Sequence, residues 1–158
     1  MSMETTDTQH GISVVIPTYN RSTVVARAVA SALAAACPPD EVIVVDDGST
    51  DETRAVLRPF DAQIRYFYTQ HSGAGRARNI GIDLAAQPLV PFLDSDDEWM
   101  PDKLYLQRKV MERFPRAVFS FATQGQRYPA ARPHISCSTF GDMTAESVLL
   151  VRRGCRRN

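Results

Sequence analysis

The chain has 158 residues, of which 44% are hydrophobic and 23% are charged, a composition typical of one globular domain rather than of a disordered or fibrous chain. Lysine plus arginine equals aspartate plus glutamate at 18 each, so the bulk charge gives no argument for nucleic acid or an anionic membrane as partner. The three cysteines lack metal-ligand spacing, and no apolar run reaches the roughly 20 residues of a membrane-spanning helix.

The first half of the chain alternates apolar runs with segments of helical spacing. Residues 1–11 are polar and predict a disordered N-terminal tail. A β-branched run at Ile12 to Ile16 predicts a strand buried on both faces, and Asn20 is placed to cap the following helix. A second buried strand at Val42 to Val45 ends in an acidic turn, and Ser49 to Glu52 forms a Ser-x-x-Glu capping box for the next helix.

The next segments continue this alternation. Further strands are predicted at Ile64 to Tyr68, Leu89 to Leu93 and Ala117 to Phe121. A glycine-containing loop at Ser72 to Gly75 leads from the first of these into a helix, and Pro101 suits the first turn of a later one. The residues that share one face of that later helix are Leu106, Val110 and Phe114.

Buried strands that alternate with amphipathic helices predict an α/β fold with a mostly parallel sheet flanked by helices. We expect this fold to be incomplete at the C-terminus, because residues 123–158 look irregular, with only Ala145 to Val151 as a candidate element. In such sheets ligands bind beyond the carboxyl ends of the strands. Three polar motifs follow predicted strands, at Thr18 to Asn20, Asp46 to Asp51 and Asp94 to Asp97.

The acidic cluster Asp94-Ser95-Asp96-Asp97 has no cation among its carboxylates. Three adjoining carboxylates repel one another unless a cation or water screens them. Oxygen ligands with few residues per ion suit Mg²⁺ or Mn²⁺ that is shared with a substrate diphosphate. The alternative is a solvated acidic turn, but the position at a strand end favours a metal site with Asp94, Asp96 and Asp97 as ligands.

Two further motifs suit a nucleotide. Asp46 and Asp47 can accept hydrogen bonds from a base edge or a ribose hydroxyl, and Gly48 lets the backbone approach a ligand. Arg76 and Arg78 lie in the first turns of a predicted helix, where the helix N-terminus and guanidinium groups favour phosphate oxygens. Taken alone, that arginine motif fits a flexible surface turn better. His71, just before it, could touch the ligand, but a single histidine in a loop is more often solvated.

Together the motifs resemble the family 2 glycosyltransferases, which are GT-A-fold enzymes that use nucleotide-sugar donors. The resemblance covers about residues 12 to 122, and its four motifs occur in order at Val14 to Asn20, Val44 to Asp51, Gly75 to Asn79 and Phe92 to Leu104. It divides the chain into a nucleotide-sugar-binding GT-A core at residues 12–122 and a remnant of the acceptor-side half at residues 123–158.

The resemblance implies a role for each matching position. Asp96 is implied as a metal ligand, Asp94 as a ribose or metal ligand, and Asp97 as their support. The implied nucleotide site, with Asp47 near the base, consists of Pro17, Tyr19, Asn20, Asp46, Asp47, Gly48, Arg76, Arg78, Asn79, Asp94 and Ser95. Bound Mn²⁺ or Mg²⁺ would neutralise charge on the diphosphate leaving group while an acceptor hydroxyl attacks with inversion.

The implied enzyme moves a sugar from a nucleotide diphosphate, most commonly UDP, to a carbohydrate or lipid-linked acceptor in cell-envelope polysaccharide biosynthesis. A cytoplasmic location is implied, and peripheral membrane association of the full-length enzyme is left open. No catalytic base is assigned, because Glu112 fits a structural helix and neither Asp142 nor Glu146 matches the family's Glu-Asp-like motif. The alternative hypothesis is a truncated nucleotide-binding fragment without turnover.

Overall fold

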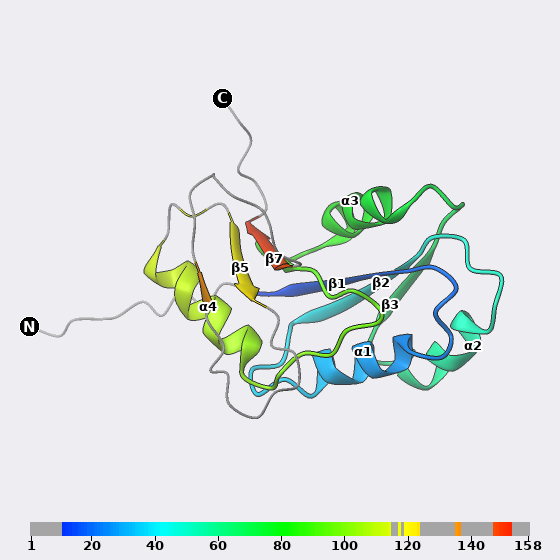
Figure 1. Cartoon of the computed structure of the whole chain (residues 1–158), viewed down its shortest axis with the longest axis horizontal. Coiled ribbons are helices and arrows are strands. Elements are labelled where there is room, and N and C mark those ends of the chain that lie inside the picture. The colour runs from blue at the N-terminus through cyan, green and yellow to red at the C-terminus, as the bar shows by residue number, and fades with distance from the viewer. Residues whose placement is uncertain (1–10, 115–116, 118, 124–134, 137–146, 153–158) are drawn as a thin grey trace, which may run out of the picture.

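The computed structural model describes residues 11–114, 117, 119–123, 135–136 and 147–152 (Figure 1). The predicted N-terminal tail lies outside these residues, apart from Gly11. The elements in chain order are β1 (Ser13–Thr18), α1 (Val25–Leu33), β2 (Glu41–Asp46), α2 (Thr53–Leu57), η1 (Arg58–Phe60), β3 (Arg65–Tyr68), α3 (Ala74–Leu84), β4 (Leu89–Pro91), α4 (Lys103–Arg113), β5 (Phe119–Thr123), β6 (Ile135–Ser136) and β7 (Ser147–Arg152).

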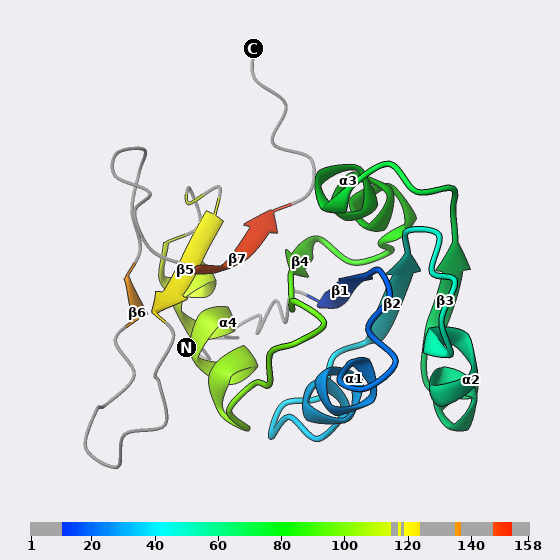
Figure 2. The same ribbon diagram turned by 45° about the vertical axis from the view of Figure 1, so that its right-hand side comes forward.

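The strands form two hydrogen-bonded groups that meet where β1 lies beside β4. The first group is parallel and has the order β1-β2-β3. Parallel bridges from Ile12 to Leu89 and from Val15 to Phe92 place β4 along the edge of β1 that β2 leaves open. The second group has the order β4-β7-β5-β6, with antiparallel pairing throughout. The predicted α/β fold with a parallel sheet flanked by helices is confirmed (Figure 2).

Both faces of β1 and β2 are apolar, and helices cover both. One face packs against α1, α2 and α4, through strand residues Val14, Ile16, Val42 and Val44. The other face packs against α3, through strand residues Val15, Ile43 and Val45. This alternation follows from the pleat, which turns successive side chains to opposite faces. The sheet is therefore the middle layer of three, and the carboxyl ends of β1, β2 and β3 stay free of helices.

Two predicted helix caps are wrong. α1 begins five residues after Asn20, and Val24 stands at its N-cap without a side-chain hydrogen bond. α2 begins at Thr53 after Glu52, again without a side-chain cap. Asn20 and Ser49 instead bind each other, because the backbone N–H of Asn20 donates to Ser49 Oγ at 2.8 Å. Their polar groups join the loops after β1 and β2 and are not available as caps.

One expectation for the second half of the chain also differs from the structure. The buried face of α4 carries Leu104, Gln107 and Met111, whereas Phe114, expected beside Leu106 and Val110, is 51% exposed. The candidate element at residues 145–151 corresponds to strand β7, which pairs with both β4 and β5. Within the described ranges, no helix is long and apolar enough to cross a bilayer.

Gly81 allows α3 to pack closely on β1, since a Cβ at this position would lie 2.2 Å from Val15 Cγ1. We expect Gly81→Ala to lower the free energy of unfolding by about 1–3 kcal/mol through overpacking, seen as a lower urea midpoint with an unchanged m-value. The matched control is Gly75→Ala on the same helix, where a Cβ meets nothing within 4 Å. It should leave stability unchanged or raise it by up to about 1 kcal/mol. Equal midpoints for the two variants would contradict the close packing.

At the amino ends of the strands, the Glu41 carboxylate gathers hydrogen bonds from three segments. Ser13 Oγ and the Ala86 N–H donate to Oε1, both at 2.5 Å, and Arg65 Nη1 donates to Oε2 at 2.7 Å. Burial raises the pKa of Glu41, but the hydrogen bonds from Ser13, Ala86 and Arg65 together outweigh it and lower the pKa below its ordinary 4.5. The charged carboxylate therefore ties β1, β3 and the end of α3 to β2.

Because the pKa of Glu41 is lower in the folded chain, its stabilisation is fully present above about pH 4.5 and is lost as the pH falls through the folded value. The stability difference between wild type and Glu41→Gln should accordingly shrink as urea unfolding is repeated from pH 7 down to pH 3. Glu52→Gln, at an exposed carboxylate, serves as the control. A difference that stays constant over this range would show that ionisation of Glu41 is irrelevant to the fold.

Candidate functional site

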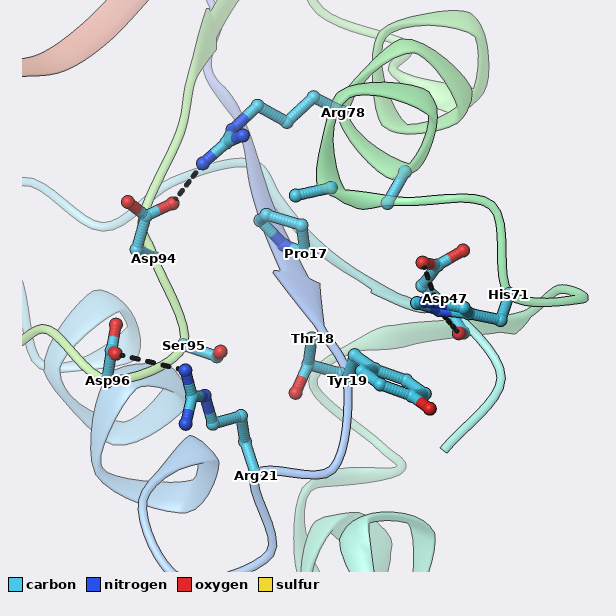
Figure 3. A pocket seen from close by; sticks show the side chains of 12 residues that line it. Pro17, Thr18, Tyr19, Arg21, Asp47, His71, Arg78, Asp94, Ser95 and Asp96 are labelled. Carbon is cyan, nitrogen blue, oxygen red and sulfur yellow. Dashed lines mark hydrogen bonds and ion pairs between the residues drawn. The ribbon is translucent and has the colours of Figure 1, made fainter. Parts of the chain in front are cut away.

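A pocket of about 350 Å³ opens at the carboxyl ends of β1, β2 and β4, beside the start of α3 (Figure 3). Its lining residues are Pro17, Thr18, Tyr19, Arg21, Asp47, His71, Ala74, Ala77, Arg78, Asp94, Ser95 and Asp96. The segments that follow each of the first four strands all contribute to this lining. A volume of this size is within the range of small-molecule sites.

The carboxylate of Asp47 anchors one wall of the pocket and is 3% exposed. Its Oδ1 accepts the backbone N–H of Ser72 and its Oδ2 that of Gly73, both at 2.8 Å. His71 Nδ1 lies 2.9 Å from the same Oδ2, and the His71 ring stacks on Tyr19 with centroids 4.0 Å apart and planes inclined by 23°. These contacts join the loops after β1, β2 and β3 into one wall that presents aromatic surface to the cavity.

Gly48 lies in the turn behind this wall and has a φ of 84°. A Cβ there would lie 2.8 Å from the backbone nitrogen of His71. Both the left-handed backbone and the close approach therefore require glycine. The neighbouring loop is held by Asn20, whose Oδ1 accepts the Thr50 N–H at 2.8 Å.

The opposite wall carries two ion pairs (Figure 3). Arg78 Nη2 lies 2.5 Å from Asp94 Oδ1, and Arg21 Nη2 lies 3.6 Å from Asp96 Oδ2. The four side chains are 36–54% exposed, so water screens both pairs and each contributes little to stability. On this wall two carboxylates are balanced by two guanidinium groups, a composition that can receive a cation and a polyanion together.

Among the residues that the structure describes, no group of three His, Cys, Asp or Glu side chains is arranged to hold a metal ion. The predicted three-carboxylate set is not assembled at the pocket, because Asp94 and Asp96 line it and Asp97 does not. Asp94 and Asp96 nevertheless fit Mg²⁺ or Mn²⁺ in its usual nucleotide setting, where one or two carboxylates share the ion with substrate phosphates.

Of the predicted nucleotide-binding residues, Pro17, Tyr19, Asp47, Arg78, Asp94 and Ser95 come together in the pocket. The predicted residues outside its lining are Asn20, Asp46, Gly48, Arg76 and Asn79. Gly48 and Asn20 shape the loops behind the pocket, and Arg76 and Asn79 are exposed.

Asp46 differs from its neighbour Asp47 in having its carboxylate committed to the fold. It is 1% exposed, its Oδ1 accepts the Ser49 N–H at 2.8 Å, and its Oδ2 accepts the Tyr66 hydroxyl at 2.5 Å. Burial and the Asp46 carboxylate both raise the pKa of Tyr66, so the phenol stays a proton donor. These bonds tie β2 to β3 and to the turn, and they leave Asp46 out of the pocket.

Five lining residues were not predicted from the sequence as binding residues: Thr18, Arg21, His71, Ala74 and Ala77. Arg21 follows the Thr18 to Asn20 motif directly, so its position next to a predicted strand end could have indicated it. The two alanines carry no chemical signal, because they matter only by leaving space. His71, which could touch a ligand but was expected to be solvated, has a side chain that is 54% exposed, and its ring is also stacked and hydrogen-bonded.

The sequence profile described as "Glycosyl transferase family 2" matches residues 13–141. The chain belongs to glycosyltransferase family 2. It is 40% identical over 103 residues to an uncharacterized glycosyltransferase of Rickettsia felis, covering 64% of this chain and 17% of that one. It is 42% identical over 115 residues to the putative teichuronic acid biosynthesis glycosyltransferase TuaG of Bacillus subtilis, covering 70% and 45%.

The structure of this family 2 chain is similar to the crystal structure of S. aureus TarS 1-349 in complex with UDP-GlcNAc. The TM-score is 0.62 at 26% sequence identity, over 77% of this chain and 37% of TarS 1-349. The predicted GT-A fold is thereby confirmed. In these comparisons the family 2 chain spans less than half the length of the proteins that it matches.

Arg78 and Arg76 lie two residues apart on α3, but only Arg78 lines the pocket. We expect Arg78→Met to weaken UDP binding about tenfold or more, because a hydrogen bond to a charged group is worth about 1.5–3 kcal/mol. Arg76→Met is the matched control and should change the affinity by less than about twofold. Titration calorimetry with UDP measures both, and equal losses would refute the assignment of Arg78 to the ligand site.

Proposed function

We propose that this chain forms the donor-binding part of a glycosyltransferase that moves a sugar from a nucleotide diphosphate, with UDP the favoured nucleotide, to an acceptor hydroxyl. The observation that carries the proposal is an aromatic wall and two carboxylate–arginine pairs facing one cavity. A nucleotide diphosphate needs both, since it joins a flat base to a polyanion. The position beyond the carboxyl ends of parallel strands is where such ligands bind in α/β sheets.

Tyr19 and Asp47 would receive the nucleoside. The Asp47 carboxylate only accepts hydrogen bonds, and Oδ1 uses one of its acceptor positions on the Ser72 N–H. The remaining position suits a base that presents a ring N–H, as uracil, thymine and guanine do. The similarity to TarS, whose crystal structure contains UDP-GlcNAc, supports uracil among these.

Asp94 and Asp96 would hold Mn²⁺ or Mg²⁺ together with the donor diphosphate, and Asp97 would support them from outside the pocket. The ion, when bound, neutralises charge that develops on the diphosphate leaving group. Arg78 and Arg21, which pair with these carboxylates in the structure, would donate to oxygens of the donor diphosphate. Ser95 stands between Asp94 and Asp96 in the sequence and is buried. Its hydroxyl would form a hydrogen bond with the nucleotide.

In the proposed reaction an acceptor hydroxyl attacks the anomeric carbon while the bond from that carbon to the diphosphate oxygen breaks, with inversion of configuration. No described residue is assigned as the base. Glu112, on α4, pairs with Lys109 at 3.1 Å and is explained by its helix, whereas Asp142 and Glu146 lie outside the described residues.

The acceptor class is proposed to be a carbohydrate or lipid-linked intermediate of cell-envelope polysaccharide synthesis. The similarity to TuaG, which is named for teichuronic acid biosynthesis, supports this choice. A cytoplasmic location, with peripheral membrane association left open, and the absence of a nucleic-acid partner remain predictions from the sequence.

Metal dependence tests the proposed roles of Asp94 and Asp96. UDP should bind about tenfold or more tightly in Mn²⁺ than in EDTA, and Asp94→Asn and Asp96→Asn should each reduce this difference, because each removes a negative ligand. Glu98→Gln is the matched control, since Glu98 is an exposed carboxylate that pairs with Arg27 at 3.4 Å and does not line the pocket. The same metal dependence in all three variants would rule out a cation at this site.

Turnover separates an active enzyme from the alternative of a donor-binding fragment. The measurement is release of UDP from UDP-sugars in Mn²⁺, with and without a panel of sugar acceptors. UDP release supports the transferase, whereas tight UDP binding without release supports the fragment. Failure of wild-type protein to bind UDP, GDP or dTDP at millimolar concentration would overturn the proposed donor site itself.

A further inference from the structure

His71 lies in the loop after β3 and makes contacts that a solvated loop histidine would not make. Its ring stacks on Tyr19, from the loop after β1, at a centroid distance of 4.0 Å. Its Nδ1 lies 3.0 Å from the backbone oxygen of Asp47 and 2.9 Å from Asp47 Oδ2. The loop is also pressed against Gly48, where a Cβ would come within 2.8 Å of the His71 nitrogen.

The proton on the His71 ring can be placed from these contacts. Both atoms near Nδ1 are oxygens that only accept hydrogen bonds, so Nδ1 must carry a proton and donate. With the Gly73 N–H, this proton fills the acceptor positions of Asp47 Oδ2. Within the described part of the chain, Oδ1 accepts only the Ser72 N–H, and it keeps an acceptor position for a ligand. The imidazole therefore occupies Oδ2, so that Oδ1 is the carboxylate oxygen that can accept a hydrogen bond from the base.

The stacking contact restricts the orientation of the Tyr19 ring. Tyr19 is 42% exposed, and an exposed phenol ring samples several orientations unless a neighbour restricts it. His71 covers one face of the ring and holds its plane within 23° of the imidazole plane. A ring that is fixed before the ligand arrives loses less entropy on binding.

We propose that His71 is a positioning residue for the nucleoside: it fixes the Tyr19 ring and the Asp47 carboxylate in the orientation that receives a base with a ring N–H. The inference rests on the proposed donor-binding function and adds a residue to it. His71 acts through Tyr19 and Asp47 and has no part in the bond changes of sugar transfer.

Three substitutions separate the two contacts of His71. His71→Ala removes both, His71→Phe keeps a ring on Tyr19, and His71→Asn keeps a polar group toward Asp47. We expect His71→Ala to weaken UDP binding about tenfold, a loss within the range that aromatic stacking on a base contributes to affinity. The other two variants should lose less UDP affinity than His71→Ala. Gln70→Ala, at the exposed neighbouring position, is the control and should bind UDP like the wild type.

Pyrophosphate distinguishes positioning of the base from general damage to the fold. The affinity of the protein for pyrophosphate, measured by titration calorimetry, should change by less than about twofold in His71→Ala. The reason is that the ion pairs at Arg78 and Arg21 are on the other wall of the pocket. Equal losses for UDP and pyrophosphate would overturn the proposal, since only a structural defect affects both.

A double-mutant cycle tests whether His71 acts through Tyr19. In a Tyr19→Ala background, His71→Ala should weaken UDP binding by less than about threefold, and a second full tenfold loss would overturn the coupling. Wild-type UDP affinity in His71→Ala would overturn the inference while the donor site stands. If the wild type binds no nucleotide, the proposed function fails first, and the two failures are therefore distinguishable.

Discussion

The burial of the Asp47 carboxylate is the constraint on which the pocket depends. A carboxylate that is 3% exposed is tolerated only if hydrogen bonds replace its water, and the N–H groups of Ser72 and Gly73 do so. Gly73 is also the N-cap residue of α3. Satisfying one buried charge therefore fixes where α3 begins, and with it the direction in which Arg78, in the second turn, reaches toward Asp94.

The second constraint is charge balance across the cavity. Without a ligand, Asp94 and Asp96 are neutralised by Arg78 and Arg21. In the proposed donor complex, a divalent cation and a diphosphate would leave these four side chains with balanced charge again, because the carboxylates would face the cation and the arginines would face phosphate. Exposed ion pairs contribute about 0–1 kcal/mol, so the exchange costs little. A pocket rich in carboxylates can in this way be part of a stable fold before any metal binds.

Apolar runs and turn residues were enough to predict the first five strands, their alternation with helices and the edge of the sheet that carries the pocket, since these depend on local pattern. They could not predict that Ser49 would bind the loop after β1 and not cap α2, because that contact joins residues far apart in the chain. These sequence signals also could not distinguish between nearby residues of the same type. Asp46 and Asp47 are adjacent yet point to different surroundings. Arg76 and Arg78 are separated by about 200° around a helix, so only one faces the cavity.

All twelve lining residues fall between positions 17 and 96, at the end of β1, in the loops that follow four successive strands and in the first turns of α3. Loops on a fixed scaffold can vary without changing the scaffold, so under the proposed function the segments that select the acceptor could vary while the donor pocket is retained. The independence is incomplete, however. Isolated bridges join the segments of β4 and β1, whereas β7 pairs with all three residues of β4, with Pro91 opposite Leu150. The strand that leads to Asp94 is therefore held on one side by a segment more than fifty residues further along the chain, and the acidic turn depends on both halves of the sheet.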